Sequence, residues 1–153
     1  MMIAARLRLL VIALWVGSLW TIGYLVAPTL FMTLADRVLA GTIAGKLFRV
    51  EAWLSVVMAV LLLALIAGSV AASRARTWLY RLTAVMLGCT LVGYFGLQPM
   101  MAALREAAPG GVFSADARLQ FGVLHGVASG LYLIQSIAGI VLIMKSDQAG
   151  IKV

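Results

Sequence analysis

Four polar side chains recur along the last apolar stretch of the chain, at His125, Ser129, Tyr132 and Ser136. Because successive helical residues turn by about 100°, this spacing places them on one strip of a helix. Inside a bilayer such a strip must face protein, water or a ligand, since facing lipid is costly. Two interpretations stay open: a cavity wall with His125 as its titratable group, or a packing seam of interhelical hydrogen bonds.

Basic residues suggest where a pocket near His125 would open. Lys46 and Arg49 are three residues apart, Glu51 follows, and Arg118 lies seven residues before His125. Grouped around an outer mouth, these charges would attract an anion or a lipid phosphate. The alternative is a set of charges solvated by water and lipid headgroups. The candidate pocket residues are His125, Ser129, Tyr132, Arg118, Lys46, Arg49 and Glu51.

A metal site is a further hypothesis. Met100 and Met101, with His125, would offer soft ligands to a copper-like ion, although methionines more often fill gaps in cores. One histidine and one cysteine exclude a bis-histidine haem or a cysteine zinc cluster within one protomer. The sequence has no phosphate loop, no zinc-protease helix and no nucleophile–base–acid set. We therefore expect no enzyme, no catalytic residues and no cofactor, with a haem- or metal-dependent redox protein as an alternative.

Glycines form small-residue stripes on three of the apolar stretches. Gly122, Gly126 and Gly130 recur every four residues, and Gly17 and Gly93 lie on similar stripes. Such stripes let another backbone approach closely. We expect them to pack the helices together inside a bundle. The alternative is that they dock on a second copy or on another membrane protein.

The amino-acid composition indicates that these residues lie in a lipid bilayer rather than in water. Of 153 residues, 64% are apolar and 11% are charged, and the mean hydropathy is +1.10. A soluble domain needs more polar surface, and a disordered chain is polar, so both classes are excluded. Charges divide the chain into four uncharged stretches, 9–35, 52–73, 82–104 and 119–144, each long enough to cross a hydrocarbon core of about 30 Å. The sequence predicts an all-α, integral membrane four-helix bundle, one domain over 1–153, with spans near 9–33, 50–72, 79–99 and 119–144.

Loop charges predict the orientation of the bundle. The N-terminal segment, the second-to-third connection and the C-terminal tail carry more Lys and Arg than the two opposite connections. The positive-inside rule then places both termini inside (N-in/C-in), in the inner (cytoplasmic) membrane. The cations are expected to contact lipid rather than nucleic acid. Residues 36–50 are predicted to be an amphipathic outer segment, lying in the interface or extending the second helix outward. Pro28 is expected to kink or end the first helix.

Several short segments resemble a known family. VAPTLF (26–31), AGKLF (44–48), Pro99 followed by Leu104-Arg105, and FGVLHG (121–126) with Ser129 occur in this order. Together they resemble the transmembrane protein 205-like family (domain of unknown function 4149). The resemblance implies a four-helix membrane protein without an established activity. Resistance to, or export of, metal-containing compounds has been suggested for eukaryotic members. Tyr132 stands where the family has an asparagine.

A more distant resemblance concerns the first span. WTIG (20–23), followed by Tyr24 and Pro28, is similar to copper-resistance-D-type and protoporphyrinogen-oxidase-type four-helix membrane proteins. The oxidase family has a functional histidine where this chain has Ala13, which argues against haem-dependent oxidase chemistry. The leading hypothesis is therefore a protein that binds or moves a small solute, a metal species or a lipid headgroup in an outward-facing pocket near His125.

Overall fold

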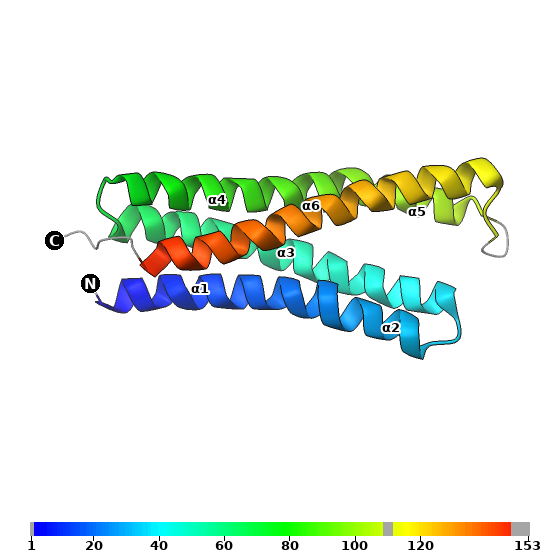
Figure 1. Ribbon diagram of the computed structural model, residues 1–153, viewed down its shortest axis with the longest axis horizontal. Coiled ribbons are helices and arrows are strands. Elements are labelled where there is room, and N and C mark those ends of the chain that lie inside the picture. Colours follow the sequence, from blue (N-terminus) through cyan, green and yellow to red (C-terminus); the bar gives the residue numbers. More distant parts are fainter. Residues whose placement is uncertain (1, 109–111, 148–153) are drawn as a thin grey trace.

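Four long helical rods make up the structure, a computed structural model that describes residues 2–108 and 112–147 (Figure 1). The first rod joins α1 (Met2–Trp20), the π-helical segment η1 (Thr21–Val26) and α2 (Ala27–Thr33). The second is α3 (Arg37–Ser69). The third joins α4 (Arg74–Thr90), the π-helical segment η2 (Leu91–Leu97) and α5 (Gln98–Glu106), and the fourth is α6 (Ala115–Asp147).

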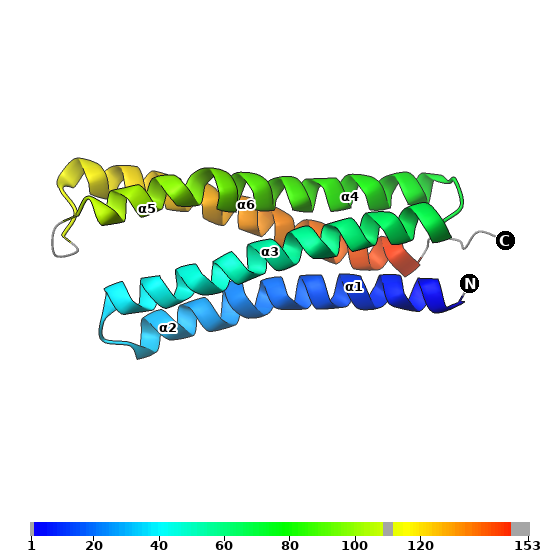
Figure 2. The same ribbon diagram turned by 180° about the vertical axis from the view of Figure 1, so that it is seen from behind.

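Each rod is long and apolar enough to cross a membrane. The four candidate spans contain 31 to 33 residues, which corresponds to about 50 Å of helix, more than a bilayer core requires. The chain is therefore an all-α four-helix membrane bundle, as the sequence predicts. Both termini lie at the same end of it (Figure 2), as an even number of crossings requires. The N-in/C-in orientation stays a prediction.

Side-chain caps mark where three of the rods begin. Asp36 accepts hydrogen bonds from the backbone amides of Val38 (2.8 Å) and Leu39 (3.0 Å), and Ser73 accepts from the amide of Arg76 (3.2 Å). Ser114 caps α6 in the same way, accepting a hydrogen bond from the backbone amide of Ala117 (3.2 Å). Aspartate and serine at these positions satisfy amides that the first helical turn leaves free. Because α3 begins directly after Asp36, the predicted amphipathic segment forms the first turns of the second helix, at the end of the bundle away from the termini.

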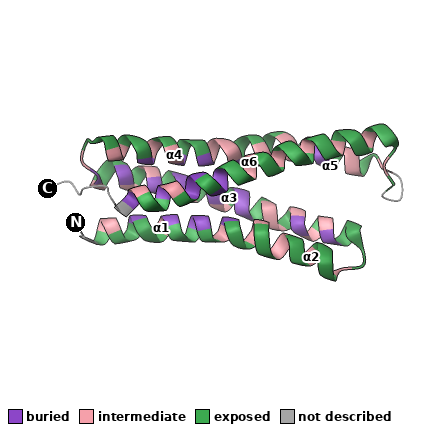
Figure 3. Cartoon of the chain, in the orientation of Figure 1, coloured by how far each residue is buried: buried purple, intermediate pink, exposed green. Residues whose placement is uncertain are grey.

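Apolar packing is concentrated in the half of the bundle that carries the termini (Figure 3). The cluster has Trp15 and Leu62 fully buried at its centre. Away from this half, the α2–α3 pair diverges from the α5–α6 pair (Figure 1). The buried cluster consists of Ile12, Trp15, Val16, Leu19, Ala59, Leu62, Ile66, Val70, Leu79, Met86, Ala138 and Leu142.

A buried arginine ties the first rod to the last at the end where the termini lie. Arg8 is only 2% exposed. Its Nε donates to Ser146 Oγ (3.1 Å) and its Nη2 to the Ser146 carbonyl oxygen (3.2 Å). A cation is stabilised there because the last turn of a helix presents free carbonyl groups. This contact closes the packed half of the bundle.

Within the described residues, the glycine stripes make no close contact with another helix. A Cβ atom built on Gly17, Gly93, Gly122, Gly126 or Gly130 meets no heavy atom within 4 Å. The spacing identifies a smooth helix face but not what lies opposite, and α6 packs through another face. Docking of a partner on the open stripe stays a prediction.

Close approach occurs at two other glycines. A Cβ on Gly23 would lie 2.8 Å from Cζ of Tyr132, and a Cβ on Gly139 would lie 2.9 Å from Cγ2 of Val16. Both glycines allow α6 to contact the first rod. They mark the true small-residue contacts of the bundle.

We predict that Gly139→Ala lowers the free energy of unfolding by about 1–3 kcal/mol, because the new methyl group overpacks against Val16, a stiff β-branched side chain. Gly130→Ala on the same helix is the matched control and should cause no loss. Thermal unfolding in detergent, followed by circular dichroism, measures both. Equal destabilisation by the two variants would contradict the observed packing of α6.

Candidate binding cavity

A cavity of about 570 Å³ lies between the four rods. This volume lies within the range of about 300–1,000 Å³ typical of small-molecule sites. All four rods contribute to its wall, with Tyr24 from η1, Glu51 from α3, Tyr94 from η2 and Tyr132 from α6. The complete lining is Leu19, Gly23, Tyr24, Ala27, Pro28, Phe31, Phe48, Glu51, Ala52, Ser55, Cys89, Thr90, Gly93, Tyr94, Gln98, Met101, His125, Ala128, Ser129, Tyr132, Leu133 and Gln135.

Two π-helical segments shape opposite parts of this wall. Pro28 follows η1 and Pro99 follows η2, and a proline cannot donate the hydrogen bond that an α-helix needs at its position. A π-helical turn accommodates such an interruption and is frequent at functional sites. The rods therefore continue past both prolines, so Pro28 does not end the first helix. Each segment gives a Gly-Tyr pair to the cavity, 23–24 and 93–94.

The carboxyl group of Glu51 belongs to a deeply buried polar part of the wall, and the residue is 2% exposed. Its Oε1 accepts hydrogen bonds from Ser55 Oγ (3.1 Å) and Ser18 Oγ (3.3 Å). Trp15 Nε1 in turn donates to Ser55 Oγ (2.8 Å). The other oxygen, Oε2, is buried and has no hydrogen-bond partner among the described residues. A buried acceptor without a donor is costly.

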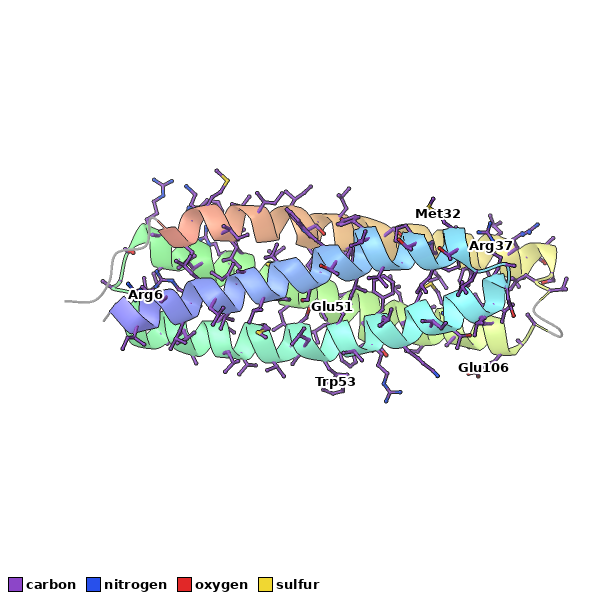
Figure 4. All side chains as sticks on the ribbon, turned by 90° about the horizontal axis from the view of Figure 1, so that it is seen from below. Arg6, Met32, Arg37, Glu51, Trp53 and Glu106 are labelled. Atoms are coloured by element: carbon purple, nitrogen blue, oxygen red, sulfur yellow. The ribbon has the colours of Figure 1, made fainter. Side chains whose placement is uncertain are left out.

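Glu51 does not lie at the outer mouth that the sequence suggests. Figure 4 shows it between Arg6, near the end where the termini lie, and Arg37 at the opposite end. Its partner Ser18 lies ten residues from Arg8 and fifteen from Thr33, the last residue of α2, which is about 15 and 22 Å along the rod. The prediction took Glu51 as the end of a span, whereas α3 continues through it.

The basic candidates are also placed outside the cavity. Arg49 lies two positions before Glu51, about 200° around the helix, and Lys46 lies five positions before it, about 140° around. Both are exposed, as is Arg118, and none of the three lines the cavity. The proposed basic mouth with Glu51 is therefore not assembled.

One part of the polar strip on α6 lines the cavity, and another part forms hydrogen bonds to a neighbouring helix. His125, Ser129 and Tyr132 line the cavity. Farther along the helix, Ser136 Oγ accepts a hydrogen bond from Tyr24 Oη (2.9 Å). Tyr132 belongs to both parts, because its hydroxyl donates to the Leu19 carbonyl oxygen (2.6 Å).

Sequence reasoning missed Gln135 on the same helix. Its Nε2 donates to Thr90 Oγ1 (2.9 Å), and both residues are buried. Thr90 is the last residue before η2, and Leu19 lies two residues before η1, so α6 bonds to each of these rods next to its π-helical segment. A signal was present, since Gln135 lies three positions from Tyr132 on the same side of α6. The Trp15–Ser55–Glu51 network was missed because its members come from two helices, and the sequence does not show which faces of α1 and α3 meet.

Aromatic rings surround the polar groups. The Tyr132 ring meets Phe48 edge to face at 5.6 Å and Tyr24 at 6.0 Å between centroids. His125 stacks on Phe121 at 6.1 Å, and the Arg105 guanidinium lies 5.5 Å from the centre of the same Phe121 ring. The His125 imidazole thus lies in the cavity wall and stacks on the Phe121 ring.

The metal-ligand candidates are only partly brought together. His125 and Met101 line the cavity, but Met100 does not, and its side chain is 54% exposed. Across residues 2–108 and 112–147, no group of three His, Cys, Asp or Glu side chains could hold a metal ion. Cys89, the single cysteine, lines the cavity as a free thiol.

Residues 10–109 match the family described as Domain of unknown function (DUF4149). The chain belongs to the DUF4149 family. The match covers Glu51, Cys89 and both π-helical segments, whereas the strip from His125 onward lies beyond it. No curated protein and no solved structure matches the chain. Because the family's description assigns no activity, the function of this DUF4149 protein must be argued from its cavity.

We predict that Tyr132→Phe lowers the stability of the DUF4149 protein by about 0.6–2 kcal/mol, because it removes the hydrogen bond to the Leu19 carbonyl group inside the bundle. Tyr94→Phe is the matched control. Tyr94 also lines the cavity, but among the described residues its hydroxyl makes no hydrogen bond. Thermal unfolding in detergent compares the two, and equal losses would show that the Tyr132 hydroxyl does not join the rods.

Proposed function

We propose that this DUF4149 protein is a non-enzymatic, multi-pass protein of the inner (cytoplasmic) membrane that binds a small amphipathic solute. The observation that carries this proposal is the cavity of about 570 Å³, to which all four rods contribute. Most of its wall lies in the half of the bundle away from the main apolar cluster, and Leu19 belongs to both. A four-helix bundle built only for structural support would fill this space with side chains.

The wall has the composition of a site for a small molecule. Aromatic and aliphatic side chains, such as Phe31, Phe48 and Leu133, make up most of it. A few polar groups, among them Glu51 and Gln98, stand at separate positions. Small-molecule sites combine an apolar lining with few polar groups that orient the ligand. This pattern favours a solute with an apolar body and one polar end.

The placement of the reactive side chains favours binding over catalysis. Glu51, Cys89 and His125 all line the cavity. Within the described part of the chain, no hydrogen bond joins any two of them, whereas a nucleophile and its base are normally in such contact. The wall therefore supports recognition of a solute rather than a reaction.

Access is from the half of the bundle away from the termini. His125 and Ser129 are exposed although they line the cavity. The opposite half is closed by the apolar cluster and by the contact between Arg8 and Ser146. With both termini inside, this opening faces outward, so the solute would enter from the outer side or from the outer leaflet.

Cys89 offers a direct test, because the only thiol of the protein lies in the cavity wall. The purified protein in lipid nanodiscs is treated with methyl methanethiosulfonate, a small neutral thiol reagent. Three probes of one apolar shape are added in turn: 1-adamantanol, 1-adamantylamine and 1-adamantanecarboxylate. At least one of them should slow modification of Cys89 several-fold, as followed by intact mass.

The matched control places the thiol outside the cavity. In a Cys89→Ser background, Val57→Cys puts a cysteine on the exposed face of α3, since Val57 is 51% exposed. Its modification rate should not change with any probe. If none of the three probes protects Cys89 at saturation, or if they protect both cysteines equally, the cavity is not a solute-binding site.

A further inference from the structure

We infer that the cavity selects a cationic solute, a protonated amine carried on a compact apolar body, and that Glu51 binds its charged end. This inference rests on the proposed function, because it names the class of solute that the cavity takes. It combines three observations on the described residues: Glu51 Oε2 has no hydrogen-bond donor, no basic side chain lies beside it, and aromatic rings line the wall.

The acceptor is Oε2 of Glu51. Two serine hydroxyls and the Trp15 indole hold the carboxyl group in place through Oε1 and Ser55. Oε2 has no partner in the described part of the chain, although the residue lines the cavity and is 2% exposed. A carboxylate held this way gains most from a donor that enters the cavity, and a charged donor forms the stronger hydrogen bond.

No basic side chain of the described residues neutralises this carboxyl group. Lys46 and Arg49 are exposed on other faces of α3. His125, the one basic side chain of the wall, stacks on Phe121 of its own helix. An ionised carboxylate without a counter-ion is unfavourable inside an apolar bundle, so a cationic ligand would replace the missing partner.

The rings beside Glu51 suit a cation for a second reason. Tyr132, Phe48 and Tyr24 meet edge to face within the wall. Aromatic faces carry partial negative charge and attract ammonium groups. The same faces and the carboxylate would repel an anion. A phosphate or lipid phosphate, which the predicted basic mouth would have bound, is therefore the wrong ligand for this cavity.

The volume and the apolar lining of the cavity indicate what the uncharged part of the ligand is. Leu19, Ala27, Phe31, Ala52 and Leu133 offer aliphatic and aromatic surface around the polar groups. A bare inorganic cation would leave most of about 570 Å³ unfilled. A compact hydrocarbon body would contact this surface and remove it from water. The geometry therefore favours an amphipathic monocation over a metal ion.

The experiment compares the three adamantyl probes, which share one body and differ in charge. Isothermal titration calorimetry is run on the protein in nanodiscs, with empty nanodiscs as the blank. 1-Adamantylamine should bind at least about tenfold more tightly than 1-adamantanol, and 1-adamantanecarboxylate more weakly than both. Protection of Cys89 should follow the same order, which places the binding event in the cavity.

Glu51→Gln removes the charge but keeps the shape and an oxygen acceptor for Ser55. Its affinity for 1-adamantylamine should fall at least about tenfold, to the level of the alcohol, while the affinity for 1-adamantanol stays within about twofold. Glu106→Gln is the matched control. It removes the same charge from an exposed position at the far end of the bundle (Figure 4) and should leave the amine affinity unchanged.

Two results would overturn the inference and leave the proposed function standing. One is an alcohol that binds the unaltered protein as tightly as the amine, and the other is a Glu51→Gln variant that still prefers the amine. If Glu51→Gln fails to fold, the order of the three probes on the unaltered protein decides alone. Absence of binding by all three probes contradicts the proposed function itself.

Discussion

The hydrogen bonds that α6 makes to the first and third rods hold the bundle together where its packed half ends. Tyr132 and Ser136 contact the first rod, and Gln135 contacts Thr90 of the third. Lipid offers no partner to a polar group, so each of these side chains must find one inside the protein. Once they are satisfied, α6 is fixed between the two rods that contain the π-helical segments. The shape of the cavity depends on this arrangement.

The two halves of the bundle differ in how their interiors are filled. Near the termini, fully buried side chains such as Trp15, Leu62 and Leu142 fill the interior. Beyond the α6 hydrogen bonds, the helix pairs diverge and aromatic rings line a hollow instead. Glu51 lies at the transition, connected through Ser55 to Trp15 of the packed core. The carboxyl group of Glu51 is therefore held by the packed half of the bundle and lines the cavity of the open half.

Much of the fold could be predicted from the sequence, because lipid imposes simple rules. Uncharged stretches longer than 20 residues must be helices, and the 4-3-4 spacing from His125 to Ser136 identifies the inward face of α6. Sequence alone places Glu51 wrongly, because a charge on an inward helix face lies within a span rather than at its limit. The glycine stripe on α6 was misread because spacing defines a face but not its neighbour. The π-helical turns depend on how the backbone adjusts before Pro28 and Pro99, which no periodicity reveals.

The extra residue that each π-helical turn accommodates rotates the helix that follows it, α2 in the first rod and α5 in the third. One residue corresponds to about 100° of rotation in an α-helix. A rod with a regular α-helical path through η1 would therefore present a different flank of α2 inward, and Phe31 would leave the wall. The same holds for η2, α5 and Met101. These two irregular turns act as angular offsets: they set which side chains of α2 and α5 face the cavity and which face the acyl chains.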